Sequence, residues 1–235
     1  PMSAPGQRRT YLLGKGLDSV MNYPFKNAVL DFVKGKPAEQ AAGEILSICE
    51  HYPAPALNTA LNFLSTHDTE RAITAIAGEP CNNRDRYVSG EAYEEGMLRL
   101  RMAYAIIYTL PGLPCLYYGD EIGMQGYRDP FNRGYYCWDS HEERLKPVLA
   151  QLAHLRHSRE AFRTGALRVL RAEGGVLHYQ RVGATETAEI IVNRSEHIIV
   201  EPLASGKHTE VNPMGFTIVV EENGHNPNHS YYDIQ

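Results

Sequence analysis

The chain has 235 residues, 22% of them charged, and a formal net charge of −5. This composition is typical of a globular protein, and the lack of a basic patch argues against a nucleic-acid partner. Because no run approaches the ~20 apolar residues of a membrane span and the first residues contain no apolar signal core, we expect a cytoplasmic protein without a membrane segment.

The first two thirds of the sequence alternate short apolar runs with amphipathic segments. Strands are predicted for residues 18–23, for the apolar run that ends at residue 68, and for residues 113–118. Helices are predicted where apolar side chains recur every three or four positions, at residues 24–34, 37–52, 71–77, 91–110 and 140–162. Polar or proline-containing stretches predict loops at residues 53–57 and 78–90.

After residue 164 the period of the pattern changes. Short runs rich in β-branched residues, separated by Gly, Asn, Pro and Ser, predict strands at residues 176–182, 188–193, 197–200 and 215–220. We expect an antiparallel β-sandwich as a second domain, residues 163–235, whose polar tail from residue 223 packs loosely.

The sequence LNFLSTHDTER, residues 61–71, is the most informative segment. His67 and Asp68 follow the apolar run, and Thr69 is predicted to cap the next helix. In a parallel α/β sheet this strand end is where ligands bind. An ordinary strand-to-helix turn with Asp68 as a cap is the alternative.

A second segment, residues 110–139, ends its predicted strand in Gly119-Asp120-Glu121. Consecutive strand residues point to opposite faces, so Asp120 and Glu121 cannot both address one bond, and we expect them to hold the strand end by hydrogen bonds. Asp129 and Arg133, four residues apart on the next loop, could pair with each other.

Together the two segments resemble the α-amylase family of glycoside hydrolases. The family motifs F-L-x-x-H-D and P-G-x-P-x-x-Y-Y-G-D-E stand at residues 63–68 and 111–121. The run D-P-F-N-R at residues 129–133, closing at Trp138-Asp139, is similar to the neopullulanase and cyclomaltodextrinase branch. Residues 18–25 resemble the family's sixth barrel strand, and residues 165–193 the start of its small β-domain.

The resemblance implies an α/β fold in which residues 1–162 are the C-terminal part of a TIM (β/α)8 barrel, about strands six to eight with their helices. Residues 163–235 would be the β-sandwich domain. Length agrees, because a complete barrel takes roughly 250 residues and this chain cannot hold one together with a second domain.

The resemblance also implies roles for individual residues. Asp68 would stabilise the transition state of a retaining hydrolysis, and His67 would bind the same sugar ring. Asp129 and Arg133 would contact the sugar one position further along. Trp138 could stack on a sugar or serve as a buried anchor.

The family's nucleophile and general acid have no counterpart here, since Arg84-Asp85-Arg86 lies in a predicted polar loop rather than at a strand end. The implied function is therefore the C-terminal portion of an α-glucan hydrolase, inactive alone, whose parent could be secreted. The alternative is a non-catalytic carbohydrate-binding or protein-interaction module on the same fold.

The implied ligand is an α-glucan or maltooligosaccharide. Cys49, Cys81, Cys115 and Cys137 form no C-x-x-C pair, so we expect buried free thiols, no metal and no cofactor. A barrel cut before strand six has two open edges. We expect these edges to be covered by residues 1–17 or by a second copy, in a homo-oligomer.

Overall fold

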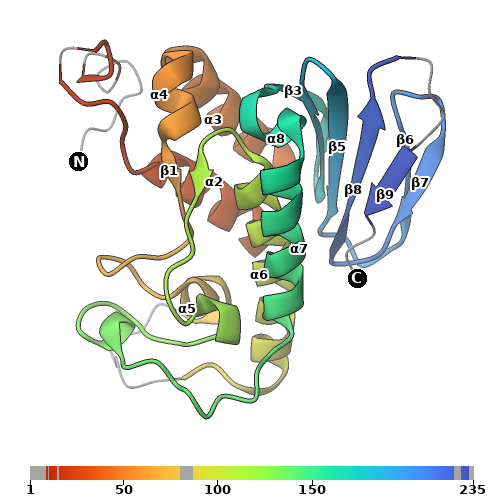
Figure 1. Cartoon of the computed structure of the whole chain (residues 1–235). Coiled ribbons are helices and arrows are strands. Elements are labelled where there is room, and N and C mark those ends of the chain that lie inside the picture. Colours follow the sequence, from red (N-terminus) through yellow and green to blue (C-terminus); the bar gives the residue numbers. More distant parts are fainter. Residues whose placement is uncertain (1–8, 10, 15, 80–86, 225–228, 233–235) are drawn as a thin grey trace.

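The structure is a computed structural model that describes residues 9, 11–14, 16–79, 87–224 and 229–232. The described residues form a helical part with three short parallel strand segments, followed by an antiparallel sheet (Figure 1). None of the described helices combines the length and the apolar character needed to cross a membrane.

The helical part contains most of the predicted helices at nearly the predicted positions. Its α-helices are α2 (Tyr23–Lys34), α3 (Ala38–His51), α4 (Ala54–Thr59), α5 (Ala72–Ala77), α6 (Gly90–Thr109), α7 (Leu145–Ser158) and α8 (Glu160–Thr164). Two short 3₁₀ turns, η1 (Asp120–Ile122) and η2 (Phe131–Arg133), follow the last of the parallel strand segments.

Two predictions about these helices are wrong. Residues 53–57 are not a loop, because Pro53 precedes α4 and Pro55 fits its first turn, where the fixed φ of proline is favourable. Residues 140–162 are not one helix, since α7 begins only at Leu145 and Arg159 is extended between α7 and α8. The buried carboxylate of Glu186 accepts a hydrogen bond from the Ala161 N–H at 3.2 Å, which stabilises the separate start of α8.

Three strand segments lie parallel and side by side. Met21 forms a bridge with Leu61, and β1 (Leu61–Asn62) pairs with β2 (Leu113–Pro114). Each is shorter than predicted. The strand segment at Met21 ends there because the next residue, Asn22, caps α2. The Asn22 side chain accepts a hydrogen bond from the N–H of Phe25 at 3.4 Å.

Two buried side-chain amides, those of Asn22 and Asn62, link the three strand segments. Asn22 Nδ2 donates to Asn62 Oδ1 at 3.1 Å, and Asn62 Nδ2 donates to the Pro111 carbonyl at 2.7 Å. Within the described ranges these three are the parallel strand segments, so the fold is a mixed α/β arrangement without a closed barrel.

The second part is a five-stranded antiparallel sheet in the order β3-β4-β5-β8-β9, with a separate two-stranded sheet, β6-β7. The strands are β3 (Ala166–Glu173), β4 (Val176–Val182), β5 (Glu186–Asn193), β6 (Ile199–Pro202), β7 (His208–Val211), β8 (Gly215–Glu222) and β9 (His229–Tyr232). The sequence pattern misses β3, whose residues are exposed or half-buried at the sheet edge. Within the tail expected to pack loosely, residues 229–232 instead pair with β8, while residues 225–228 and 233–235 lie outside the described residues.

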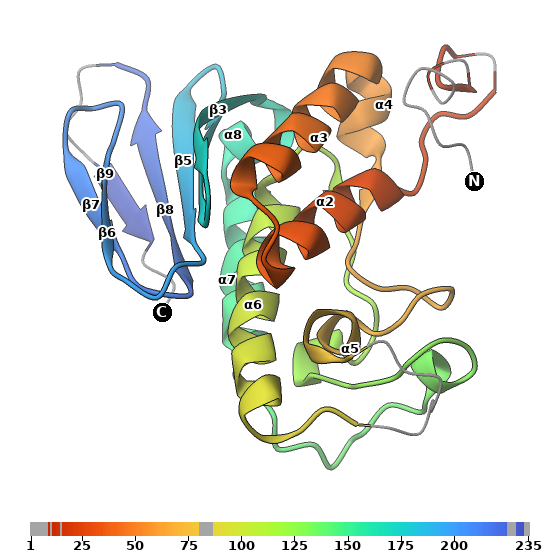
Figure 2. The same ribbon diagram turned by 180° about the vertical axis from the view of Figure 1, so that it is seen from behind.

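The two faces of the large sheet belong to different hydrophobic clusters, because alternate strand residues point to opposite faces. Tyr179, Ile190 and Ile218 share one continuous core with the helices, whereas Ile191 and Val219 face the small sheet. Figure 2 shows α6 between the sheet and α5, and α6 contacts both. The core therefore crosses the expected boundary between residues 162 and 163, and a division into two domains stays a prediction.

Candidate active site

His67 and Asp68 lie on the loop of residues 65–71, here called the tip loop, which connects the end of β1 to α5. Their side chains are 61% and 57% exposed, and His67 Nε2 is 3.3 Å from Asp68 Oδ1. Both polar groups are accessible to a ligand at the carboxyl end of the middle strand segment.

The tip loop forms its own tight turn. Thr66 Oγ1 accepts a hydrogen bond from the Asp68 N–H at 3.1 Å, and Thr69 Oγ1 accepts one from the Thr66 N–H at 2.9 Å. Thr69 is thus a turn residue, and the prediction that it caps the helix is wrong, because α5 begins at Ala72 after the cap position Arg71.

The structure brings all four predicted site residues together. Arg133 Nε is 2.8 Å from Asp129 Oδ1 and also donates to the His67 carbonyl at 3.1 Å. Arg133 Nη2 lies 3.9 Å from Asp68 Oδ1. Arg133 therefore pairs with Asp129, as the simpler interpretation expects, and at the same time contacts the tip loop.

Asn132 also holds the tip loop and is a residue that the sequence interpretation missed. Its side chain is fully buried, and its Nδ2 donates to the carbonyls of His67 and Thr69 at 2.8 and 2.7 Å. The only signal for it in the sequence is its place inside the D-P-F-N-R run.

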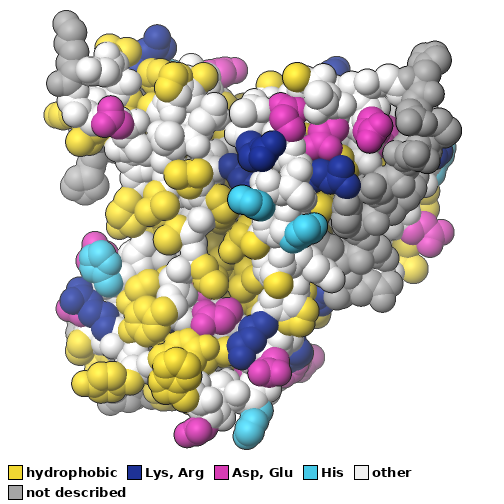
Figure 3. Space-filling model, in the orientation of Figure 1, with side chains coloured by type: hydrophobic (Ala, Val, Ile, Leu, Met, Phe, Trp, Pro, Cys, Tyr) yellow, Lys and Arg dark blue, Asp and Glu magenta, His cyan; other side chains and the backbone are white. Residues whose placement is uncertain are grey.

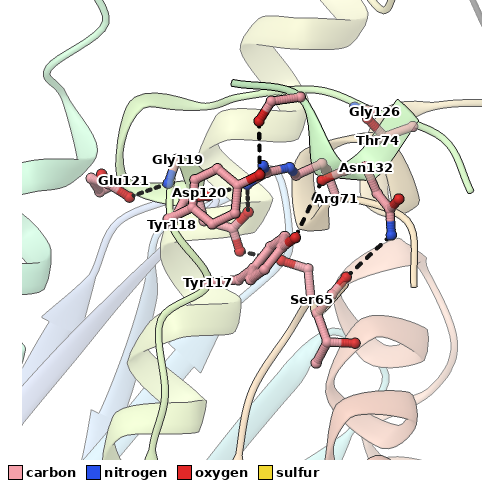
Figure 4. A network of polar contacts seen from close by, with 12 residues as sticks. Ser65, Arg71, Thr74, Tyr117, Tyr118, Gly119, Asp120, Glu121, Gly126 and Asn132 are labelled. Atoms are coloured by element: carbon pink, nitrogen blue, oxygen red, sulfur yellow. Dashed lines mark hydrogen bonds and ion pairs between the residues drawn. The ribbon is translucent and has the colours of Figure 1, made fainter. Parts of the chain in front are cut away.

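A buried polar network lies beneath the loop (Figure 4). Asp120 Oδ2 accepts hydrogen bonds from Ser65 Oγ and from Tyr104 Oη of α6, the latter at 2.6 Å. Arg71 Nη1 donates to the Tyr118 carbonyl and lies 3.7 Å from Asp120 Oδ1. Burial raises the pKa of Asp120 to about 6, although the hydrogen bonds from Ser65 and Tyr104 and the charge of Arg71 act in the opposite direction.

Asp120 and Glu121 do point apart, but not for the predicted reason. The two residues belong to η1 rather than to a strand, and Glu121 accepts a hydrogen bond from the Gly119 N–H at 2.8 Å. The sequence pattern predicts that Asp120 holds only the end of its own strand. In the structure Asp120 also binds Ser65 and so connects the third strand segment to the tip loop.

Exposed aromatic side chains follow η2. Trp138, the only Trp of the chain, is 85% exposed, and its ring centroid lies 4.7 Å from that of Tyr136. Tyr135 is fully exposed. Exposure rules out the buried-anchor interpretation of Trp138 and leaves its ring available for stacking.

The remaining His, cysteine and acidic residues bear on the expectation that the chain holds no metal. Among the described residues no group of three or more His, Cys, Asp or Glu side chains could hold a metal ion. Cys49, Cys115 and Cys137 are free thiols, but contrary to expectation none of the three is buried: Cys49 and Cys115 are half-buried and Cys137 is exposed. Cys81 and residues 84–86 lie outside the described residues.

Comparison with known proteins identifies relatives of the chain. Residues 2–168 match the family model Alpha amylase, catalytic domain. The chain is 32% identical over 199 residues to a cyclomaltodextrinase of Geobacillus thermopakistaniensis, which covers 82% of this chain and 31% of the relative. It is 30% identical over 207 residues to neopullulanase 2 of Thermoactinomyces vulgaris, which covers 84% and 32%.

A solved structure shares the same fold. The cyclic α-maltosyl-(1→6)-maltose hydrolase of Arthrobacter globiformis superimposes with a TM-score of 0.79 at 27% identity, covering 91% of this chain and 46% of that one. That enzyme has also been solved in complexes with its cyclic sugar and with maltose. The chain thus spans less than half of this structure and about a third of the two curated relatives.

Proposed function

This chain belongs to the α-amylase family of glycoside hydrolases, and from that premise we propose that it forms part of the active site of a retaining enzyme that cleaves α-1,4 or α-1,6 glucosidic bonds. In this proposal Asp68 stabilises the transition state. The observation that supports the assignment best is its position: an exposed carboxylate on the tip loop, beside His67 and within 3.9 Å of Arg133.

A carboxylate in such a position can assist the chemistry. A retaining glycosidase passes through an oxocarbenium-like transition state, and hydrogen bonds to the sugar 2-OH that strengthen in that state lower the barrier by several kcal/mol. An exposed carboxylate on a loop with a fixed backbone can make such a bond, and His67 can bind the same ring in the ground state.

Asp129 and Arg133 would bind the neighbouring sugar. Their ion pair leaves Arg133 48% exposed and Asp129 58% exposed, so both can also reach a ligand. Trp138 would add a stacking surface for the apolar face of a glucose ring. The ligand in this proposal is an α-glucan or a maltooligosaccharide, and the nucleophile and the general acid come from residues outside this chain.

The experiment is steady-state kinetics of the complete enzyme on maltooligosaccharides and pullulan. Asp68→Asn should lower kcat at least about 100-fold and change KM little, because an interaction made chiefly in the transition state affects the chemical step. His67→Ala should also raise KM, because His67 binds the ground state. A change confined to KM in Asp68→Asn would make Asp68 a binding residue and refute the assignment.

A further inference from the structure

One buried carboxylate contacts both ends of the tip loop. Ser65, at the start of the loop, donates a hydrogen bond from its hydroxyl to Asp120 Oδ2. Arg71, at the end of the loop, lies with its Nη1 3.7 Å from Asp120 Oδ1. All three residues are buried, and Figure 4 shows them side by side. The group Ser65, Arg71 and Asp120 is called the clamp below.

The guanidinium of Arg71 is held on several sides. It lies over the rings of Tyr117 and Tyr118, 4.4 Å from each centroid, and Nη1 donates to the Tyr118 carbonyl. The backbone N–H of Arg71 donates to the Gly126 carbonyl at 2.9 Å. The end of the tip loop is therefore fixed to the segment that follows β2, in a planar geometry that a lysine could not reproduce.

The side chain of Asp68, by contrast, is weakly held. Among the described residues its carboxylate has two ionic neighbours, His67 at 3.3 Å and Arg133 at 3.9 Å, and all three side chains are about half exposed. Exposed ion pairs of this kind contribute little to a fixed geometry. The position of the Asp68 carboxylate consequently depends on the backbone of the tip loop.

We propose that Ser65, Arg71 and Asp120 are positioning residues for Asp68: they fix both ends of the tip loop against the neighbouring strand segment and so set where its carboxylate meets the sugar. The inference rests on the proposed function of Asp68. Displacing a catalytic group by about 1 Å can cost as much as 100-fold in rate, so loosening the loop should affect the chemical step.

Two hydroxyl groups provide a matched test. Ser65 and Tyr104 each donate one hydrogen bond to Asp120 Oδ2, but only Ser65 belongs to the tip loop. In the complete enzyme, Ser65→Ala should lower kcat about 10-fold or more with KM changed less than about 2-fold. Tyr104→Phe should lower the melting temperature about as much as Ser65→Ala does, because each variant removes one hydrogen bond to Asp120. It should leave kcat within about 2-fold of the wild type.

A double-mutant cycle makes the test specific for Asp68. If the clamp acts through Asp68, adding Ser65→Ala to Asp68→Asn should cost no further loss of kcat. Equal kcat losses in Ser65→Ala and Tyr104→Phe, no loss in Ser65→Ala, or additivity in the cycle would each overturn the inference. Arg71→Lys, which keeps the charge, should reproduce the Ser65→Ala result, and an unchanged kcat in this variant would also contradict the clamp.

The same experiments separate the two proposals. A large kcat loss in Asp68→Asn without one in Ser65→Ala refutes only the clamp and leaves the function of Asp68 standing. An unchanged kcat in Asp68→Asn refutes the proposed function and with it the clamp.

Discussion

Two aspartates on neighbouring loops occupy opposite environments. Asp68 is more than half exposed at the strand end, whereas Asp120 is buried and accepts hydrogen bonds from two hydroxyl groups. Surroundings of this kind give chemically identical groups different tasks. In our account Asp68 meets the substrate, and Asp120 holds the loop on which Asp68 stands.

The buried Asp120 should make stability depend on pH. Its folded pKa of about 6 lies above its ordinary value of 3.8, so the unfolded chain releases this proton first. The raised pKa stabilises the folded chain below about pH 4, where Asp120 is protonated in both states. As the pH rises to about 6 this contribution to the free energy of unfolding is lost, a change of about 3 kcal/mol in order of magnitude. The groups that face this carboxyl are Arg71, Tyr104, Glu121 and Cys115.

The substitution Asp120→Asn replaces the carboxyl by an amide that does not ionise, so it should remove the pH-dependent contribution of this residue to the free energy of unfolding. We expect the free energy of unfolding of the wild type, measured relative to Asp120→Asn by chemical denaturation, to fall between pH 4 and pH 6 and to be constant above pH 7. Glu121→Gln, in the same 3₁₀ turn, is the control for loss of a charge. A difference between wild type and Asp120→Asn that does not vary with pH would contradict the assigned burial effect.

At the scale of elements, the sequence predicts the helices α2, α3 and α6 well and the parallel strands poorly. α2 and α6 begin and end within one residue of the predicted bounds, because amphipathic periodicity over three or more turns is a strong signal. β1 and β2 pair over only two residues each, although the apolar runs around them are longer.

Site residues divide in the same way. Asp68 and Arg133 stand in motifs with a fixed spacing, so the sequence identifies them. Asn132 and Arg71 act through contacts to backbone carbonyls across 47 to 65 residues of chain, and such partners have no periodic signature in the sequence. These contacts form because the tip loop lies close to the segment that follows β2, and only the folded chain shows that proximity.

A buried arginine contributes to the contact between the sheet and the helices. Arg181 of β4 donates to the Thr109 carbonyl at the end of α6, at 2.6 Å, and to the Gly165 carbonyl at 3.0 and 2.7 Å. Burial lowers the pKa of its guanidinium to about 9. These bonds satisfy carbonyls that a helix end otherwise leaves unpaired.

Arg181→Met should therefore destabilise the chain by about 3 kcal/mol, because it leaves buried carbonyls without donors. Arg168→Met, at an exposed position of the adjacent strand β3, is the matched control and should cost less than about 0.5 kcal/mol. Chemical denaturation followed by circular dichroism measures both. Equal effects of the two substitutions would show that the buried hydrogen bonds of Arg181 do not determine stability.

At the scale of the whole molecule, the three parallel strand segments pair only with one another among the described residues. Met21 and Leu113, on the two outer segments, are 38% and 50% exposed. Figure 3 shows hydrophobic side chains gathered down the face on which β1 lies. Exposed apolar surface next to unpaired strand edges favours association with another chain.

We therefore expect the isolated chain of residues 1–235 to self-associate and to hydrolyse no α-glucan. The outer strand segments have no further strand partner within the described ranges, and the proposed nucleophile and general acid lie elsewhere. Light scattering at micromolar concentration tests the first expectation. An assay on maltooligosaccharides and pullulan tests the second. A monomer, or turnover that Asp68→Asn abolishes, would contradict the corresponding expectation.

The central claim is that Asp68 binds the transition state more strongly than the ground state, and ligand affinity measures this most directly. Calorimetric titration of the complete enzyme compares maltose with a glucosyl inhibitor whose cationic half-chair ring mimics an oxocarbenium ion. Asp68→Asn should weaken inhibitor binding about 100-fold or more and maltose binding less than about 3-fold. Equal weakening of both ligands, or no weakening of inhibitor binding, would contradict the account.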